Sequence, residues 1–207
     1  MFTKQNVMTT ASFTTLIQYY EGVAFMLGRT HSIAGVASGL ALSHFIAGQF
    51  PAINEYAVMG IVTASALVGS LAPDIDIEQS TFSKRVPILS IPYKLIAKLP
   101  FKCFQHRGIT HSLLFPLIFV GLCLYFTAMN HYLVLALLGL TVGTLSHIIL
   151  DMLNYKGVAI FSPIWNKMFH LTPYALAVEA GSFGETIIRV LIWLGVIWYV
   201  AFVLFAE

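Results

Sequence analysis

Five long apolar stretches limit what this chain can fold into more than any other feature of its sequence. A helix needs roughly 20 mostly apolar residues to cross a bilayer, and five segments approach that length. They are 32–50, 56–72, 112–129, 132–150 and 187–206. Only 10% of the residues are charged, whereas a soluble domain is about a quarter charged. The sequence therefore predicts an all-α fold, a polytopic membrane helical bundle of about five transmembrane helices.

The domain organisation follows from the position of these segments. Residues 26–207 are predicted to form a single multi-pass membrane domain. Residues 1–25 contain one early lysine but no clean apolar core, so they do not look like a signal peptide. They are expected to be an N-terminal extension, poorly ordered. Small residues in the first two spans, as in AGVASGLALS, suit close contact between helices. Cys103 and Cys123 form no CxxC pair and are expected to be unpaired and non-catalytic.

Basic residues lie on one side of the predicted bundle. The two short connections on the other side, 51–55 and 130–131, contain neither lysine nor arginine. Because loops rich in Lys and Arg stay in the cytoplasm, the sequence predicts a cytoplasmic (inner) membrane protein whose C-terminus lies outside. In the basic loop 73–111, the run IPYKLIAKLPFK fits either an interfacial helix on anionic headgroups or a solvated loop. Membrane lipid is the expected partner. The net charge of +2 is too small to imply nucleic acid, and the oligomeric state is left open.

Side chains able to bind a metal gather at four ends of the predicted spans. In an up-down bundle these four ends, which alternate between starts and ends, share one membrane face, here the cytoplasmic one. His147 and Asp151 are four residues apart and share a helix face. Extended backbone after Pro73 would point Asp74 and Asp76 the same way. The candidate ligands are His31, Asp74, Asp76, His106, His111, His147 and Asp151.

This mixture of side chains indicates a metal site. Imidazole together with carboxylate suits zinc, with manganese or iron as alternatives, and seven ligands leave room for two ions. Such a site can turn water into hydroxide and clamp a phosphoryl oxygen, which favours phosphoester hydrolysis. Asp74 or Asp151 would orient the water or bridge the ions, and Arg107 would hold an anion by its planar fork. Gly108 would permit a turn, and Thr110 and Ser112 would cap the third helix.

Other interpretations of the same residues are open. The motif PDID is as typical of a helix-ending turn as of a ligand pair, and acids at span ends also form proton relays. The ligands could serve a metal-binding transporter, although transport sites usually lie at mid-membrane. They could also be a vestigial site in a non-catalytic membrane protein. The chain contains no HExxH and no G-x-S-x-G, which argues against a zincin protease and a serine hydrolase.

The order of these motifs resembles a known family. His31, PDID (73–76), HRGITHS (106–112) and SHIILDMLNYKG (146–157) together are similar to the YdjM-type predicted membrane-bound metal-dependent hydrolases. That family is thought to be distantly related to zinc-dependent phospholipase C. The resemblance implies a hydrolase that acts on a phosphodiester or phospholipid. It also implies that the same seven residues are the metal ligands, and residues 1–25 depart from its pattern.

Overall fold

The structure is a computed structural model that describes residues 28–76, 80, 83, 91 and 107–205. Within these residues the fold is all-α, as predicted, and the only strand-like pairing consists of three isolated bridges. Each predicted span overlaps one helix. The helices are α2 (Gly28–Ile46), α3 (Glu55–Gly69), α6 (Leu114–Phe126), α7 (His131–Met152) and α8 (Phe183–Phe205).

The helices differ in their capacity to cross a membrane. Among the described residues, α7 and α8 are the two that are long and apolar enough. The apolar helices α3 and α6 have 15 and 13 residues. At 1.5 Å per residue, 13 residues reach about 20 Å, which is shorter than the roughly 30 Å hydrocarbon core. Five complete crossings therefore stay a prediction.

Small residues let the central helices approach closely. A Cβ atom on Gly143 of α7 would lie 2.0 Å from the carbonyl oxygen of Ala66 in α3. A Cβ on Gly39 of α2 would lie 2.7 Å from the Cα of Thr63, also in α3. The expected close contact between the first two helices is confirmed, and α3 is held between α2 and α7.

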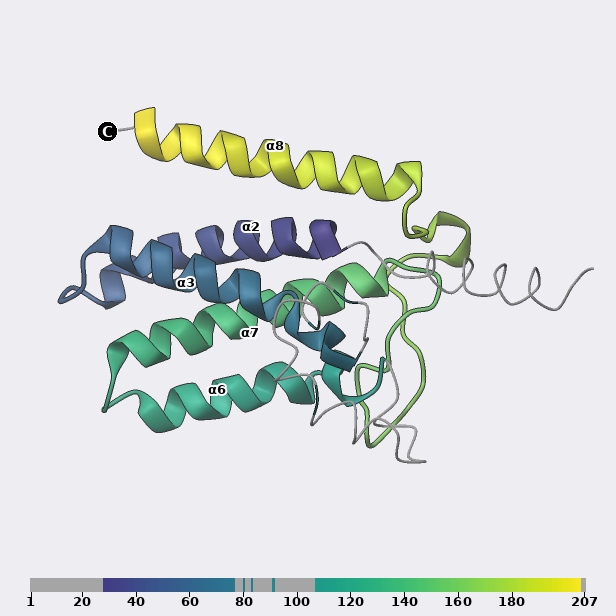
Figure 1. Cartoon of the computed structure of the whole chain (residues 1–207), viewed down its shortest axis with the longest axis horizontal. Coiled ribbons are helices and arrows are strands. Elements are labelled where there is room, and N and C mark those ends of the chain that lie inside the picture. Colours follow the sequence, from purple (N-terminus) through teal and green to yellow (C-terminus); the bar gives the residue numbers. More distant parts are fainter. Residues whose placement is uncertain (1–27, 77–79, 81–82, 84–90, 92–106, 206–207) are drawn as a thin grey trace, which may run out of the picture.

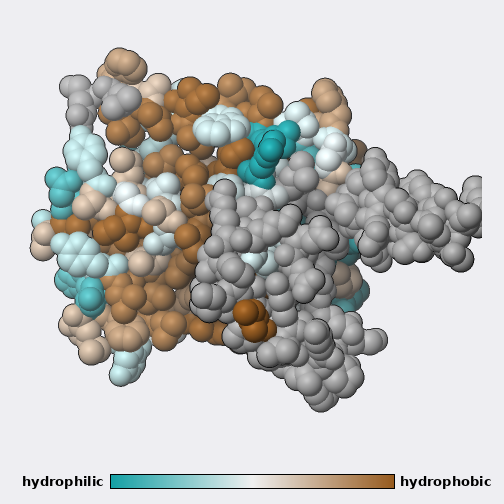
Figure 2. All heavy atoms as spheres, viewed as in Figure 1, coloured by the Kyte–Doolittle hydropathy of each residue, from teal (hydrophilic) through white to brown (hydrophobic). Residues whose placement is uncertain are grey.

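The arrangement brings four helix ends together. Figure 1 shows α2, α3, α6 and α7 side by side, with the start of α2, the end of α3, the start of α6 and the end of α7 at the same end of the bundle. This confirms the alternation of starts and ends on which the predicted site depends. Helix α8 packs against α2 on the outside of the bundle. Figure 2 shows apolar colouring over much of the helical part of this face.

Some predictions fall outside the described residues. They concern the N-terminal extension 1–25, Cys103, and the basic run 91–102 apart from Ile91. Cys123 is buried and unpaired, as expected.

Candidate metal centre

The last turns of α7 supply two of the predicted ligands. His147 and Asp151 are 0% and 2% exposed, and His147 Nε2 lies 3.8 Å from Asp151 Oδ2. The spacing of four residues places both side chains on one helix face, as the sequence predicted. These two residues lie at the centre of the bundle, because α7 packs against both α3 and α2.

The first turn of α2 adds a third candidate ligand. His31 is 1% exposed, and its Nε2 lies 3.5 Å from Asp151 Oδ1. Its ring stacks on the ring of His147, with 3.8 Å between the ring centroids. The side chains of the two helices therefore meet in one buried group.

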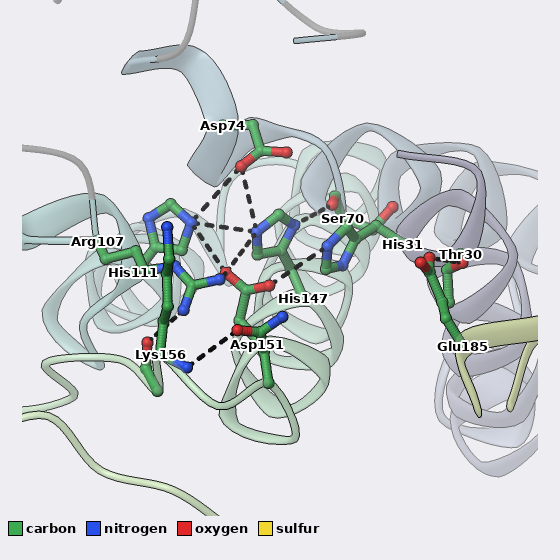
Figure 3. A network of polar contacts seen from close by, with 12 residues as sticks. Thr30, His31, Ser70, Asp74, Arg107, His111, His147, Asp151, Lys156 and Glu185 are labelled. Atoms are coloured by element: carbon green, nitrogen blue, oxygen red, sulfur yellow. Dashed lines mark hydrogen bonds and ion pairs between the residues drawn. The ribbon is translucent and has the colours of Figure 1, made fainter. Parts of the chain in front are cut away.

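Two 3₁₀ helices complete the group from the remaining chain segments. Asp74 lies in η2 (Ala72–Asp76), directly after α3, and His111 ends η4 (Ile109–His111), directly before α6. His111 Nε2 lies 3.6 Å from Asp74 Oδ1, 3.4 Å from Asp151 Oδ2 and 3.2 Å from His147 Nε2. The side chain of Asp74 is 16% exposed, so it is the most accessible of these five groups. Figure 3 shows all five converging on one centre.

The spacing of the donor atoms fits a metal ion. A tetrahedral zinc with bonds of about 2.0–2.1 Å holds its ligand atoms about 3.3 Å apart, and the distances given above run from 3.2 to 3.8 Å. Two sets of three ligand atoms lie within 4.8 Å of one another. They are His31, His147 and Asp151, and Asp74, His111 and His147. Within the described part of the chain, buried Asp151 Oδ1 accepts no hydrogen bond, which a cation would remedy.

The electrostatics of the cluster also favour a cation. Two carboxylates, Asp74 and Asp151, face the imidazole nitrogens, and the guanidinium of Arg107 lies 3.4 Å from Asp151. The side chain of Asp151 is 4% exposed. A buried charge needs a partner of opposite sign, and a divalent ion meets that need.

Two partners that the sequence did not reveal orient the histidine rings. The Nδ1 of His147 donates to the backbone carbonyl of Ser70 (2.7 Å), which leaves its Nε2 as a lone-pair donor toward the centre. His111 Nδ1 lies 3.0 Å from the hydroxyl of Thr110. Such outer contacts commonly fix the tautomer of a metal-binding histidine. A backbone carbonyl leaves no trace in sequence, whereas Thr110 stands in the motif THS but was expected to cap a helix.

Arg107 contacts a carboxylate of the cluster itself, whereas its expected role in holding a substrate anion stays a prediction. It is 4% exposed, its Nη1 donates to the carbonyl of Gly157 (2.6 Å), and its Nη2 lies 3.4 Å from Asp151 Oδ2. Its backbone has a φ of 63°, a left-handed conformation that is uncommon in non-glycine residues and that clusters at functional sites. The turn before η4 thus has its left-handed residue at Arg107, whereas Gly108 has a φ of −86°.

Two local expectations are wrong. Residues 72–76 form a 3₁₀ helix and not an extended segment, so the stated reason for pairing Asp74 with Asp76 fails. Helix α6 has Leu113 at its N-cap without a side-chain cap, and Ser112 Oγ instead donates to the carbonyl of Ile109. The side chain of Asp76 and the whole of His106 lie outside the described residues, so their part in the site stays a prediction.

Comparisons with known proteins place the chain among membrane proteins. A family model described as YdjM inner membrane protein matches residues 26–207. The uncharacterized protein YvsG of Bacillus subtilis is 33% identical over 79% of this chain and 87% of its own length. The inner membrane protein YdjM of Escherichia coli is 34% identical over 49% of this chain, and the match spans about half (49%) of that protein. No solved structure matches.

Proposed function

This chain belongs to the YdjM inner membrane protein family, and on that premise we propose that it is a membrane-bound, metal-dependent hydrolase of a phosphoester or phospholipid. One observation carries the proposal. Three imidazoles and two carboxylates from four separate chain segments form two overlapping sets of three possible metal ligands that share His147. They are His31, Asp74, His111, His147 and Asp151.

The described donors suffice for one complete ion site. His147 Nδ1 is committed to Ser70, so this ring offers a single lone pair, and the two three-ligand sets that share it would serve one ion. A catalytic zinc keeps a position for water beside its protein ligands and can expand to five positions, so at most four of the five donors would bind it and one is left for another purpose. A second ion would need Asp76 and His106. We favour zinc, with manganese or iron as alternatives.

A bound divalent ion supplies Lewis acidity, which lowers the pKa of water and polarises a phosphoryl oxygen. The chain's own residues do the rest. Asp74, at the accessible edge of the centre, is suited to orient the attacking water and take its proton at a carboxylate oxygen. Arg107 contacts Asp151 and donates to the carbonyl of Gly157, so it holds the Asp151 carboxylate in its orientation and acts as a positioning residue.

Two substitutions test the site. Asp151→Ala and His111→Ala should each lose bound metal, measured by elemental analysis of protein purified in detergent, because each removes a buried donor. They should also lose hydrolysis of a phosphodiester or phospholipid. His44→Ala is the matched control, because His44 is an exposed histidine of the same helix as His31. Full retention of metal by both site variants would contradict the assignment.

A second candidate is a membrane protein that binds a metal without hydrolysis. The near-complete burial of His31, His111, His147 and Asp151 favours it, because a closed ion site is typical of structural metals. Stoichiometric metal with no chelator-sensitive hydrolysis of any phosphoester tested would support this candidate over the first.

The proposed location is the cytoplasmic face of the inner membrane, with the C-terminus outside, because the loops richest in Lys and Arg in the sequence connect the spans on the side predicted to carry the site. Fusion of alkaline phosphatase to the C-terminus should give active enzyme, because that reporter folds only outside the cytoplasm. A cytoplasmic C-terminus would place the site on the opposite face.

A further inference from the structure

The segment that follows α7 forms a hairpin whose base is part of the metal centre's surroundings. Val158 and Phe169 exchange two backbone hydrogen bonds of 3.1 and 2.8 Å, and we call residues 158–169 the apolar hairpin. Val158 and Ala159 are buried. The carbonyl of Gly157, one residue before the hairpin, accepts from Arg107. The hairpin therefore starts from a rigid base beside Asp151.

A further backbone hydrogen bond connects the hairpin to the residue that precedes α6. The N–H of Leu113, just before α6, donates to the carbonyl of Ile160 (2.9 Å). The base is thus held both by the residue that positions Asp151 and by the segment that carries His111. A surface that binds the hairpin would therefore also set the distance between that surface and the metal centre.

The tip of the hairpin exposes large apolar side chains. Ile164 is 95% exposed, Trp165 53%, Phe161 45% and Met168 39%. The ring of Phe169 packs edge-on against Phe161 and Trp165, at 5.2 and 5.4 Å between ring centroids. The aromatic side chains of the tip therefore pack on one another, and Ile164 stands almost fully exposed. Contiguous apolar surface of this kind marks an interaction site.

Charge and position identify the partner. The ammonium of Lys167 lies 5.6 Å from the centroid of the Trp165 ring, and residues 152–178 contain no acidic residue. Tryptophan beside lysine is the combination found at the membrane–water interface, where the ring sits at headgroup level and the cation meets anionic lipid. The hairpin also connects α7 to α8, the two helices long and apolar enough to cross a bilayer, so its base emerges at a membrane surface.

We propose that the tip of the apolar hairpin, Phe161–Met168, inserts into the headgroup and upper acyl region of an anionic leaflet. It thereby holds the metal centre at the depth of the lipid headgroups. The inference goes beyond the proposed hydrolase activity and does not need it, because a non-catalytic metal protein would dock in the same way.

Tryptophan fluorescence tests the depth of the tip. The chain has three tryptophans, so Trp193→Phe with Trp198→Phe leaves Trp165 alone. In proteoliposomes of phosphatidylcholine and phosphatidylglycerol, Trp165 should be quenched more by bromines near the headgroup end of the acyl chains than by bromines near the terminal methyl. It should also be shielded from aqueous iodide. The matched control, with Trp198 alone on α8, should respond to acyl-chain bromines.

Three outcomes would overturn the proposal. Quenching of Trp165 by iodide without bromine quenching would put the tip in water. Stronger quenching by the deep bromines would put it inside a span. Shielding from both quenchers would mean that protein covers the tip, as in an association with a second copy.

A substitution at the tip separates docking from the metal site. Ile164→Asp should release the tip, so that Trp165 becomes open to iodide, while bound metal and melting temperature stay unchanged because Ile164 makes no contact with the base. Lys167→Ala should reduce shielding in anionic vesicles and leave it unchanged in pure phosphatidylcholine. Persistent shielding in the Ile164→Asp variant would overturn the proposal, whereas loss of metal in Asp151→Ala bears only on the proposed function.

Discussion

Helices α7 and α8 have almost the same length and hydropathy, and yet they occupy opposite positions in the molecule. Both are long and apolar enough to cross a membrane, but 50% of the apolar stretch of α7 is buried inside the protein and only 6% of that of α8. Helix α7 lies at the centre and carries His147 and Asp151, whereas α8 packs on α2 at the outside. Hydropathy therefore finds a span without revealing whether other helices or lipid surround it.

The size of the side chains explains the difference. Helix α7 presents glycines where α3 crosses it, so the backbones meet at close range. Helix α8 carries bulky residues outward, with Trp193, Trp198 and Phe202 between 48% and 70% exposed. In lipid, helices associate through close packing and not through apolar burial, so the helix with small residues becomes the central one.

The largest effect is expected where the α7 backbone meets α3. Gly143→Leu should prevent folding or cost more than the roughly 1–3 kcal/mol typical of overpacking, because its Cβ would meet the backbone of Ala66 at 2.0 Å. Yield and melting temperature in detergent are the measurements. Gly195→Leu in α8 is the control, since a Cβ there meets nothing within 4 Å. Equal losses of yield and melting temperature in the two variants would contradict the difference in packing between α7 and α8.

Leucine truncation gives the second contrast. Leu135 of α7 is 0% exposed, so Leu135→Ala should cost about 2–5 kcal/mol, the range for a well-packed core leucine. Leu194 of α8 is 55% exposed, and Leu194→Ala should change stability by less than about 0.5 kcal/mol. Reversible unfolding in mixed micelles compares the two, and a costly Leu194→Ala would mean that protein covers α8.

The smallest loss of stability is expected at the hydrogen bond between Glu185 of α8 and Thr30 of α2. Glu185 is 1% exposed and accepts from the Thr30 hydroxyl (2.5 Å) and the Gly181 N–H (2.6 Å). Glu185→Gln should cost about 1–3 kcal/mol, because the amide has a single accepting oxygen and its NH₂ group would face a second donor. Bound metal should be unchanged, since α8 supplies no donor among the described ligands.

The control for this tie is Glu179→Gln, at an exposed acid six residues earlier, which should leave the melting temperature unchanged. Loss of metal in Glu185→Gln, with metal retained in the control, would show that α8 helps to shape the centre through Thr30, the neighbour of His31.

Much of the site could be predicted from sequence because the placement of its residues follows from helix periodicity and from the order of the spans. A spacing of four residues on a helix places His147 and Asp151 on one face wherever the helix lies. The alternation of span starts and ends puts His31, Asp74 and His111 at the same end of the bundle. The errors are also local. The expected extended backbone at 72–76 is a 3₁₀ helix, and the expected cap at Ser112 is absent. The conformation of short turns depends on contacts with distant segments, and the conformational propensities of the residues carry no information about those contacts.

The amino-acid sequence was enough to predict the number of apolar segments, the all-α class and the side chains that meet at one end, because hydrophobicity and periodicity act within a segment. Three features became visible only in the folded structure: which of two similar helices is central, how Ser70 and Thr110 orient the histidines, and that Arg107 contacts Asp151. These outcomes depend on close packing and on hydrogen bonds between residues far apart in the chain, whose free energy exists only once the helices have assembled.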